Sequence, residues 1–437
     1  MLTKADNHIL TRVGPGTPMG NLLRRYWMPG FPATELPEAD CPPIRLRLLG
    51  EDLVAFRDSS GRIGLVSQAC PHRGASMFFG RNEEDGLRCV YHGWKFDTEG
   101  TCVDMPNEPA ESNFKHKIHL NAYPCREANG VVWAYMGPGE PPELPALEFL
   151  SLPAENCYHP EVHFYDCNWV QALEGDIDSS HIDYLHARIT KGHILESQLF
   201  LAPNNIDKNP HLEVLTTDYG AVYAAQRRWD NANNQWYRIT QYCMPFYTMI
   251  AASGGDTVTV GAWVPLDDEH TTLIWMRANL NGPVPEERRR HSDPYSRIGG
   301  YLPRTGDPLS RYRSPAHRGN DYLLDSVKQR TEMFSGIPRD PKTQDQAMTE
   351  SMGHIYERTN ERLGTSDSMI ILVRRLLINA AKTLRDQQAA PPTATNPSLY
   401  RVRSCSVVLP PHQNWVDATR DVRRSDAGLP VAFVKPD

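Results

Sequence analysis

The 437-residue sequence has no long uninterrupted run of apolar residues. Its most apolar segment, residues 369–377, contains Arg374 and Arg375, which favours an amphipathic packed helix over a membrane span. The opening residues MLTKAD include no apolar stretch of the kind that a secretory signal needs. We therefore expect a cytoplasmic protein with no membrane partner.

An excess of basic residues is also lacking, because 46 Lys and Arg stand against 53 Asp and Glu, for a net charge of -7. Without a broad positive field, nucleic acid is not an expected partner, and a small molecule is. Cysteine is scarce as well. Nine cysteines are too few for a disulfide scaffold in a chain of this length, so metal binding becomes the more informative question.

The length exceeds the size at which one hydrophobic core stops growing, so two domains are expected. Short β-like runs at 44–49, 53–57 and 131–136 predict a β-rich first domain. Five prolines between residues 137 and 153 block both helix and central strand. We place the boundary there, with domains 1–150 and 151–437.

The second domain is predicted to be α+β, with an antiparallel sheet and helices. A helix is expected at 170–188, a second from Pro341 to Gly364, and a third capped by Thr365 or Ser366. The strand-like runs, rich in β-branched and aromatic residues, are 221–229, 237–250, 257–264 and 271–276. Residues 387–411, rich in Pro, Ala and Thr, are expected to form an extended arm.

Two mixed Cys and His pairs form the first metal motif. Cys70 and His72 make a C-x-H pair, and Cys89 and His92 make a C-x-x-H pair. A Rieske-type [2Fe-2S] cluster needs two Cys on one iron and two His on the other, so each pair can serve both metals. Zinc is the alternative reading, although common zinc patterns pair Cys with Cys and His with His.

A second group of metal-binding residue types opens the second domain. His181 and His186 lie close to the acids Glu174 and Asp178, both candidates for catalytic acids. Two His and one carboxylate hold iron in non-haem Fe(II) oxygenases. On a regular helix the two histidines would lie about 140° apart, so we predict a π-bulge or a helix break between them. The alternative is two surface histidines on an acidic helix.

The third ligand must come from distant sequence. Asp345, near the start of the helix predicted from Pro341, ranks above Asp340 and Asp367 as the carboxylate ligand. Its alternative role is electrostatic stabilisation of the helix N-terminus.

Together these motifs resemble the Rieske ring-hydroxylating oxygenases, in particular the phthalate dioxygenase branch. The segments VGPGTPMG at 13–20, RITQ at 238–241, MPFY at 244–247 and LGTSD at 363–367 are typical of that branch. The resemblance implies a β-rich Rieske domain and a catalytic domain in which a sheet grips a helix over a mononuclear Fe(II). It also implies trimers or stacked trimers, in which the cluster of one subunit faces the iron of its neighbour and Asp178 bridges a cluster histidine and an iron histidine.

The glycines at 14–20 do not have dinucleotide-binding spacing, so the electrons should come from a separate reductase. In this family that reductase is an NADH-dependent flavin and iron-sulfur protein. The expected reaction is cis-dihydroxylation of a small aromatic carboxylate with O₂, and Arg238 is the first candidate to bind the substrate carboxylate.

Three other functions stay open from the sequence. Within the family, O-demethylation of an aryl ether by monooxygenation uses the same iron chemistry. Outside the family, one alternative is an electron-transfer Rieske protein with a structural second domain. The other is a zinc hydrolase that uses His181 and His186.

Overall fold

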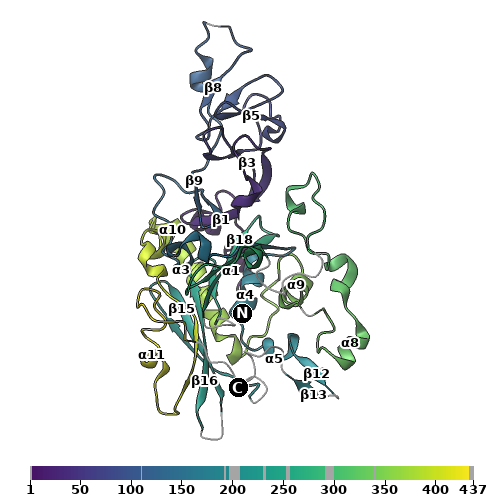
Figure 1. The fold of residues 1–437 in the computed structure, drawn as a ribbon, viewed down its shortest axis with the longest axis vertical. Helices are drawn as coiled ribbons and strands as arrows, with labels where there is room; N and C mark the ends of the chain where they lie inside the picture. The colour runs from purple at the N-terminus through teal and green to yellow at the C-terminus, as the bar shows by residue number, and fades with distance from the viewer. Residues whose placement is uncertain are drawn as a thin grey trace.

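The computed structural model describes residues 2–109, 111–190, 193–195, 207–229, 233–251, 256–290, 300–338 and 340–432. The molecule is elongated (Figure 1), with strands β5 (Arg81–Glu83) and β8 (Cys102–Asp104) at the upper end and the large sheet in the lower half. Within the described part of the chain, no helix is both long enough and apolar enough to cross a bilayer.

The N-terminal part is β-rich, as the sequence predicts. Its strands pair antiparallel in three small sheets, β1-β10-β9, β2-β3-β4 and β5-β6-β7-β8. The remaining strands are β1 (Trp27–Pro32), β2 (Ile44–Leu48), β3 (Glu51–Arg57), β4 (Ile63–Ser67), β6 (Gly86–Arg88), β7 (Lys95–Phe96), β9 (Cys125–Ala128) and β10 (Val131–Tyr135). The runs at 44–49, 53–57 and 131–136 are therefore confirmed as strands.

A separate small hydrophobic core supports the first metal motif. Val54 and Phe56 on β3 are fully buried and belong to the same cluster as Cys70 and Cys89. Burying such side chains stabilises the fold by roughly 1.5–3 kcal/mol each. The two cysteines are thus fixed by packing before any metal binds.

The chain's first helices pack on its C-terminal half. Helices α1 (Lys4–Thr11) and α2 (Pro18–Leu23) both contact the long helix α10 (Ser368–Gln387). Lys382 Nζ lies 2.6 Å from Asp6 Oδ1 across the α1 and α10 contact. Residues at the start of the chain therefore lie against the second domain in space, and the boundary near residue 150 stays a prediction.

The second domain is built on one antiparallel sheet in the order β11-β19-β18-β17-β16-β15-β14, with β20 also paired to β16. Its strands are β11 (Glu161–Tyr165), β14 (His211–Thr216), β15 (Gly220–Arg228), β16 (Gln235–Cys243), β17 (Tyr247–Met249), β18 (Thr257–Pro265), β19 (Thr271–Asn279) and β20 (Cys405–Leu409). A separate hairpin joins β12 (Arg188–Thr190) and β13 (His193–Leu195). The predicted strand runs at 221–229, 257–264 and 271–276 are confirmed, and the run at 237–250 divides into β16 and β17 around a turn at 244–246.

The prediction of an extended arm at 387–411 was wrong in its last residues, which form β20. Ser406 pairs with Arg238 and Cys405 with Ile239 of β16. Both Cys405 and Ile239 are fully buried in a small core. The strand forms because it pairs with β16 and is buried in this core. The Pro-rich sequence around it carries no periodic signal from which a strand could be predicted.

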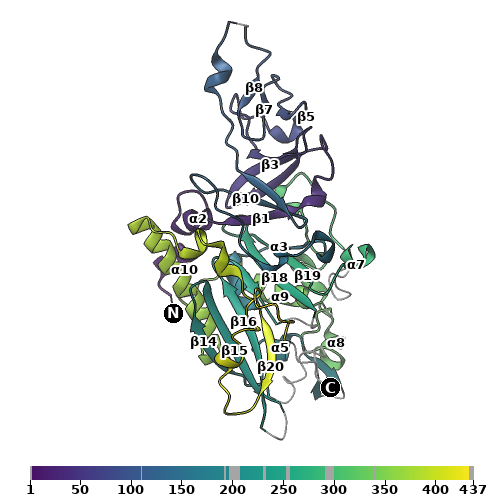
Figure 2. The same cartoon turned by 60° about the vertical axis from the view of Figure 1, so that its left-hand side comes forward.

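Helix α10 packs against β14 and β15 of the sheet (Figure 2). Helix α4 packs against β18 and β19. The other helices are α3 (Glu148–Ser151), α4 (Trp169–Asp176), α5 (Ile182–Leu185), α7 (Glu286–Arg290), α8 (Ser326–Thr331), α9 (Pro341–Ser351) and α11 (Trp415–Ala418).

Two helix predictions need correction. The helix expected up to Gly364 is α9 and ends at Ser351, because Gly353 takes a left-handed φ of +91° that stops the α-helix. The following helix, α10, begins at Ser368 after a 3₁₀ turn over Thr365–Asp367, slightly later than the predicted cap.

Glu174, predicted from the sequence as a catalytic acid, instead joins α4 to α10. Its Oε1 lies 2.6 Å from Nε of Arg374, and its Oε2 lies 3.4 Å from Nη2 of Arg358. Burial raises the pKa of Glu174, but the two arginines outweigh burial and lower it, so the carboxylate stays ionised. Both carboxylate oxygens are engaged by arginine, and we assign Glu174 a structural role.

Replacing Glu174 should therefore weaken the fold. Glu174→Gln leaves the fully buried Arg358 without its charged partner, whereas Arg374 keeps its ion pair with Glu361, and breaking a buried ion pair costs about 3–5 kcal/mol. We expect the free energy of unfolding, measured by urea titration of tryptophan fluorescence, to fall by about that amount. Glu140→Gln changes an exposed residue and serves as the matched control. Unchanged stability with complete loss of turnover would return Glu174 to the catalytic site.

Candidate metal centres

Two loops of similar backbone structure carry the first motif, in the region of β5 to β8 at the upper end of the molecule (Figure 1). Cys70 follows β4, and Cys89 lies between β6 and β7. The amide of Gly74 donates to the Cys70 carbonyl over 2.9 Å, and the amide of Gly93 donates to the Cys89 carbonyl over 2.9 Å. Both glycines have φ near +80°, a conformation that favours glycine. The pair of loops thus brings the two halves of the motif together.

The four side chains of the motif are arranged as a [2Fe-2S] cluster requires. Cys70 and Cys89 are each only 3% exposed, whereas the rings of His72 and His92 are half-buried, with centroids 4.4 Å apart. Nδ1 of His72 is buried and has no hydrogen-bond partner among the described residues. A buried nitrogen without a partner is what a metal ligand looks like before the metal binds. The thiolates would hold the inner iron and the imidazoles the outer iron.

The second group, His181, His186 and Asp345, also converges. Nε2 of His186 lies 3.1 Å from Oδ1 of Asp345, and Nε2 of His181 lies 3.6 Å from the same oxygen. One donor atom from each residue falls within 4.8 Å of the others. Residues separated by more than 150 positions in the sequence therefore present two imidazoles and one carboxylate to a common point.

The helix around the two histidines is broken, although not where the sequence prediction put the break. The predicted helix at 170–188 splits into α4 and α5, and residues 177–181 between them are not α-helical. His181 is the N-cap of the one-turn helix α5, and His186 is its C-cap. The irregularity precedes His181, so the prediction of a π-bulge or a helix break between the histidines was wrong in its position. Helix α5 is only one turn long, so both of its capping histidines can face Asp345.

The charges of the triad support one another. Burial raises the pKa of Asp345, but His186 and His181 outweigh burial and lower it to about 2, so this carboxylate is ionised at neutral pH. Burial lowers the pKa of His181, but Asp178 and Asp345 outweigh burial and raise it. The site therefore attracts positive charge, either protons or a metal cation.

Each histidine has a hydrogen-bonding or ionic partner on its other nitrogen. Nδ1 of His181 lies 3.5 Å from Oδ2 of Asp178, and Nδ1 of His186 lies 2.7 Å from Oε1 of Gln344. The amide of Gln344 donates in turn to the backbone carbonyl of Ile337. Such partners fix the ring orientation and leave Nε2 free for a metal. The sequence analysis missed Gln344, because a glutamine beside an aspartate on a helix carries no signal of its own.

An ion pair between Lys342 and the buried Asp176 holds the start of α9 in position. Lys342 Nζ lies 3.2 Å from Oδ1 of Asp176, whose Oδ2 accepts hydrogen bonds from Thr248 and Trp263. The same Lys342 Nζ lies 4.0 Å from Oδ2 of Asp345. The ammonium thus links the end of α4 and the sheet to the helix that carries the carboxylate of the triad.

Arg238, the predicted substrate residue, lies inside the sheet and not at its surface. It is 4% exposed, burial lowers its pKa, and its Nε has no hydrogen-bond partner. Tyr223 and Thr240, which pair across strands β15 and β16, place two buried hydroxyls close to each other. The charge of Arg238 also acts on the pKa of His181, which places the two within electrostatic range. Arg238 is therefore a buried cation close to the triad.

A triad of two histidines and one aspartate is the ligand set of non-haem Fe(II) oxygenases, and it leaves coordination positions open for O₂ and substrate. It also fits zinc, so ligand geometry alone does not separate oxygenase from hydrolase. Comparison with known proteins separates them.

Two family models together match most of the chain. The Rieske [2Fe-2S] domain matches residues 26–124, and the model described as LigXa C-terminal domain like matches residues 134–429. The first range contains Cys70, His72, Cys89 and His92, and the second contains the triad.

Characterised relatives align over nearly the full length. The 3-chlorobenzoate-3,4-dioxygenase oxygenase subunit of Comamonas testosteroni is 39% identical over 95% of this chain and 97% of its own. The phthalate 4,5-dioxygenase oxygenase subunit of Pseudomonas putida is 36% identical over 95% and 94%. The 5,5'-dehydrodivanillate O-demethylase oxygenase subunit of Sphingobium sp. is 34% identical over 86% and 79%.

A solved structure has the same fold. The reduced complex between oxygenase and ferredoxin in carbazole 1,9a-dioxygenase contains a chain that superposes with a TM-score of 0.55 at 18% identity, over 88% of this chain and 97% of that one. The chain therefore belongs to the Rieske non-haem iron ring-hydroxylating oxygenases, as an oxygenase subunit of the phthalate dioxygenase-like branch whose cofactors are a Rieske [2Fe-2S] cluster and a mononuclear iron.

Proposed function

We propose that this oxygenase subunit cis-dihydroxylates a small aromatic carboxylate, a phthalate or a substituted benzoate. Both atoms of O₂ are added across one ring double bond, and two electrons and two protons are consumed. The relatives that act on 3-chlorobenzoate and phthalate support an aromatic acid as the substrate class.

The single observation that carries the proposal is the unpaired guanidinium of Arg238. A charged group this deeply buried is costly unless it is paired, and no carboxylate in the described part of the chain pairs with it. The carboxylate of an aromatic acid supplies the missing charge, and the planar guanidinium can bind both of its oxygens. The hydroxyls of Tyr223 and Thr240 offer further hydrogen bonds to the substrate.

The remaining residues hold the two cofactors in place. Cys70, His72, Cys89 and His92 are the proposed cluster ligands, and His181, His186 and Asp345 are the proposed iron ligands. When bound, the cluster passes on single electrons and the iron activates O₂ beside the ring. Asp178 and Gln344 orient the two iron histidines.

Electron transfer is proposed to run between subunits of a trimer or of stacked trimers. The loops that hold the cluster and the helix α5 that holds the iron lie in opposite halves of the elongated subunit (Figure 1). Apolar side chains are exposed in both places, with Phe79, Val90 and Tyr91 near the cluster loops and Tyr184 and Phe334 near α5. Head-to-tail packing would bury both groups and bring the cluster of one subunit to Asp178 of the next.

The electron donor is proposed to be an NADH-dependent reductase with flavin and an iron-sulfur centre. The oxygenase and ferredoxin complex of carbazole 1,9a-dioxygenase supports a separate iron-sulfur donor for this fold. We propose the cytoplasm as the compartment, since NADH is supplied there.

O-demethylation is the second candidate, because one relative is an O-demethylase of an aromatic acid. In that reaction one atom of O₂ hydroxylates the methyl carbon of a methoxy group, and the other atom becomes water with two electrons and two protons. The bond between the aryl oxygen and that carbon then breaks, which releases formaldehyde and leaves a phenol on the ring. Binding of the acid by Arg238 fits either outcome, so the choice depends on what lies over the iron.

The products distinguish the two reactions. Purified protein with a class-matched reductase, NADH and a panel of aromatic acids should yield cis-diols that carry both atoms of ¹⁸O₂, measured by mass spectrometry. Formaldehyde release from methoxy-substituted acids, with no diol from the others, would establish the demethylase instead. Absence of any oxygenated product from the carboxylates would reject both.

Asp345→Ala should remove the mononuclear iron and leave the cluster intact. Because a missing carboxylate leaves two neutral imidazoles, we expect iron to fall from about three to about two atoms per chain while the electron spin resonance signal of the reduced Rieske cluster remains. The control is Asp367→Ala, which removes an acid from the turn before α10. This variant should keep all the iron. Full iron content in the Asp345 variant would exclude Asp345 as a ligand.

Arg238→Gln should impair binding of the acid more than the chemistry. Loss of a hydrogen-bonded charge partner costs about 1.5–3 kcal/mol, so kcat/KM for the aromatic acid should fall about 10- to 100-fold, mainly through KM. The neutral amide of the same acid should lose much less. Arg228→Gln, on the exposed end of β15, is the matched control. Equal loss for the acid and the amide would remove Arg238 from carboxylate recognition.

A further inference from the structure

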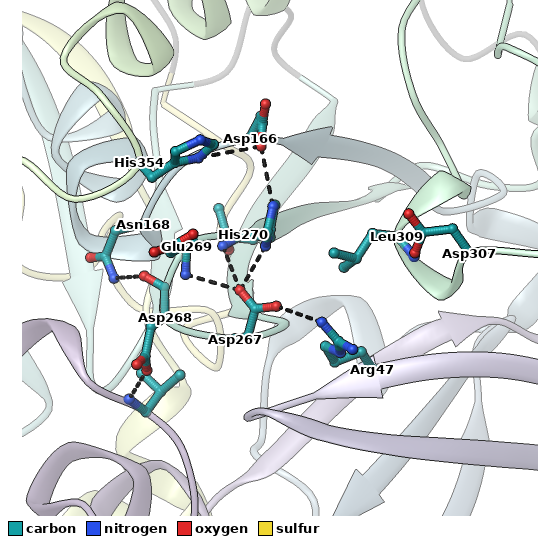
Figure 3. A network of polar contacts seen from close by, with 12 residues as sticks. Arg47, Asp166, Asn168, Asp267, Asp268, Glu269, His270, Asp307, Leu309 and His354 are labelled. Carbon is teal, nitrogen blue, oxygen red and sulfur yellow. Dashed lines mark hydrogen bonds and ion pairs between the residues drawn. The ribbon is translucent and has the colours of Figure 1, made fainter. Parts of the chain in front are cut away.

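A second cluster of metal-binding residue types lies outside the iron triad (Figure 3). Asp166 follows β11, His270 ends the turn between β18 and β19, and His354 follows α9. One donor atom from each lies within 4.8 Å of the other two. Three separate segments thus bring two imidazoles and one carboxylate together, the same residue types as at the triad.

Asp267 orients His270 within this cluster. The Oδ1 atom of Asp267 accepts hydrogen bonds from the backbone amide of His270 over 2.9 Å and from its Nδ1 over 2.7 Å. Arg47, from strand β2 of the N-terminal part, lies 3.0 Å from the other oxygen of Asp267. The remaining nitrogen, Nε2 of His270, points to Asp166 at 3.2 Å (Figure 3). A histidine whose second nitrogen donates to a carboxylate is the usual arrangement at metal sites.

His354 adds a donor that no hydrogen bond uses. Its Nδ1 is buried, lies 3.4 Å from Oδ1 of Asp166, and has no hydrogen-bond partner in the described residues. The backbone around it is fixed, because the Asn168 amide donates to the His354 carbonyl over 2.7 Å. The same oxygen of Asp166 lies 3.2 Å from Nε2 of His270, so two imidazole nitrogens from separate segments converge on one carboxylate oxygen.

The pocket favours positive charge. Two carboxylates face His270, with Asp166 Oδ1 at 3.2 Å from its Nε2 and Asp267 Oδ1 at 2.7 Å from its Nδ1. The side chains of Asp166, His270 and His354 are 25%, 17% and 42% exposed, so solvent can reach the point between them. A cation can therefore enter and be held by a carboxylate that is already ionised.

We propose that Asp166, His270 and His354 form a second metal site, which binds a divalent transition metal of the zinc class. Two imidazoles and one carboxylate suit zinc, copper or nickel and not magnesium or calcium, and zinc binds such ligands more tightly than ferrous iron does. The site is distinct from the triad, because His354 follows the C-terminal end of α9 and Asp345 lies in its N-terminal half. A bound metal would tie the end of α9 to β11 and to the β18 and β19 turn.

Zinc uptake by the iron-loaded holoenzyme tests this proposal. After mild chelation and incubation with Zn²⁺, the desalted wild-type protein should hold about one zinc per chain with its iron content unchanged, by elemental analysis. Zinc should also raise the thermal midpoint of unfolding, because it binds the folded state. His354→Gln and Asp166→Asn should lose this zinc and the thermal shift, and Asp267→Asn should weaken zinc binding about 10- to 100-fold.

His159→Gln is the matched control, because His159 is also a partly exposed histidine beside a carboxylate, Glu286. It should bind zinc as the wild type does. Equal zinc in the wild type and in His354→Gln would overturn the proposal, as would zinc uptake matched by loss of iron. Should Asp166→Asn fail to fold, His354→Gln still decides, because its side chain is the most exposed of the three.

Discussion

The position of α9 against α4 and α5 is the constraint on which the rest of the catalytic domain depends. Asp345 reaches the two histidines only because α9 is fixed at both ends. At its start Lys342 binds the buried Asp176, and near its end Gln346 donates to Glu350, which accepts from the amide of Asp166. These contacts are polar and buried, so each is effective only while its partners remain in place. Movement of α9 would open the iron triad and the second cluster together.

Some buried polar groups of the catalytic domain have hydrogen-bonding or ionic partners and others lack them. The groups that lack partners indicate where a ligand binds. Glu174 is fully used by two arginines, so its charge serves the packing of α4 on α10. Arg238 is more deeply buried than Glu174, yet it has no carboxylate partner among the described residues. A buried charge without a partner destabilises the folded state, and the cost is recovered when a ligand supplies the opposite charge. A buried ring nitrogen without a hydrogen bond, as in His72, likewise marks a position where a bound metal would supply the missing partner.

The two metal centres are held by different kinds of backbone structure. The cluster loops are rigid, with paired glycine turns above a small apolar core, which suits a centre that passes electrons without moving its ligands. The triad is assembled from the ends of a one-turn helix and from a distant helix. Such a centre keeps one side open for O₂ and substrate, and its geometry is set by tertiary contacts.

The sequence by itself determined the features whose residues lie close together in the chain. The pairs of Cys70 with His72 and of Cys89 with His92 are local, so their spacing alone predicted the [2Fe-2S] cluster, and runs rich in β-branched and aromatic residues predicted the strands of the main sheet. Only the tertiary structure decided that the helix breaks between α4 and α5, that β20 adds to the sheet, that Glu174 is an ion-pair partner, and that His354 approaches Asp166. The physical reason is that these features depend on contacts between segments far apart in the chain, and local pattern does not encode which segments will meet.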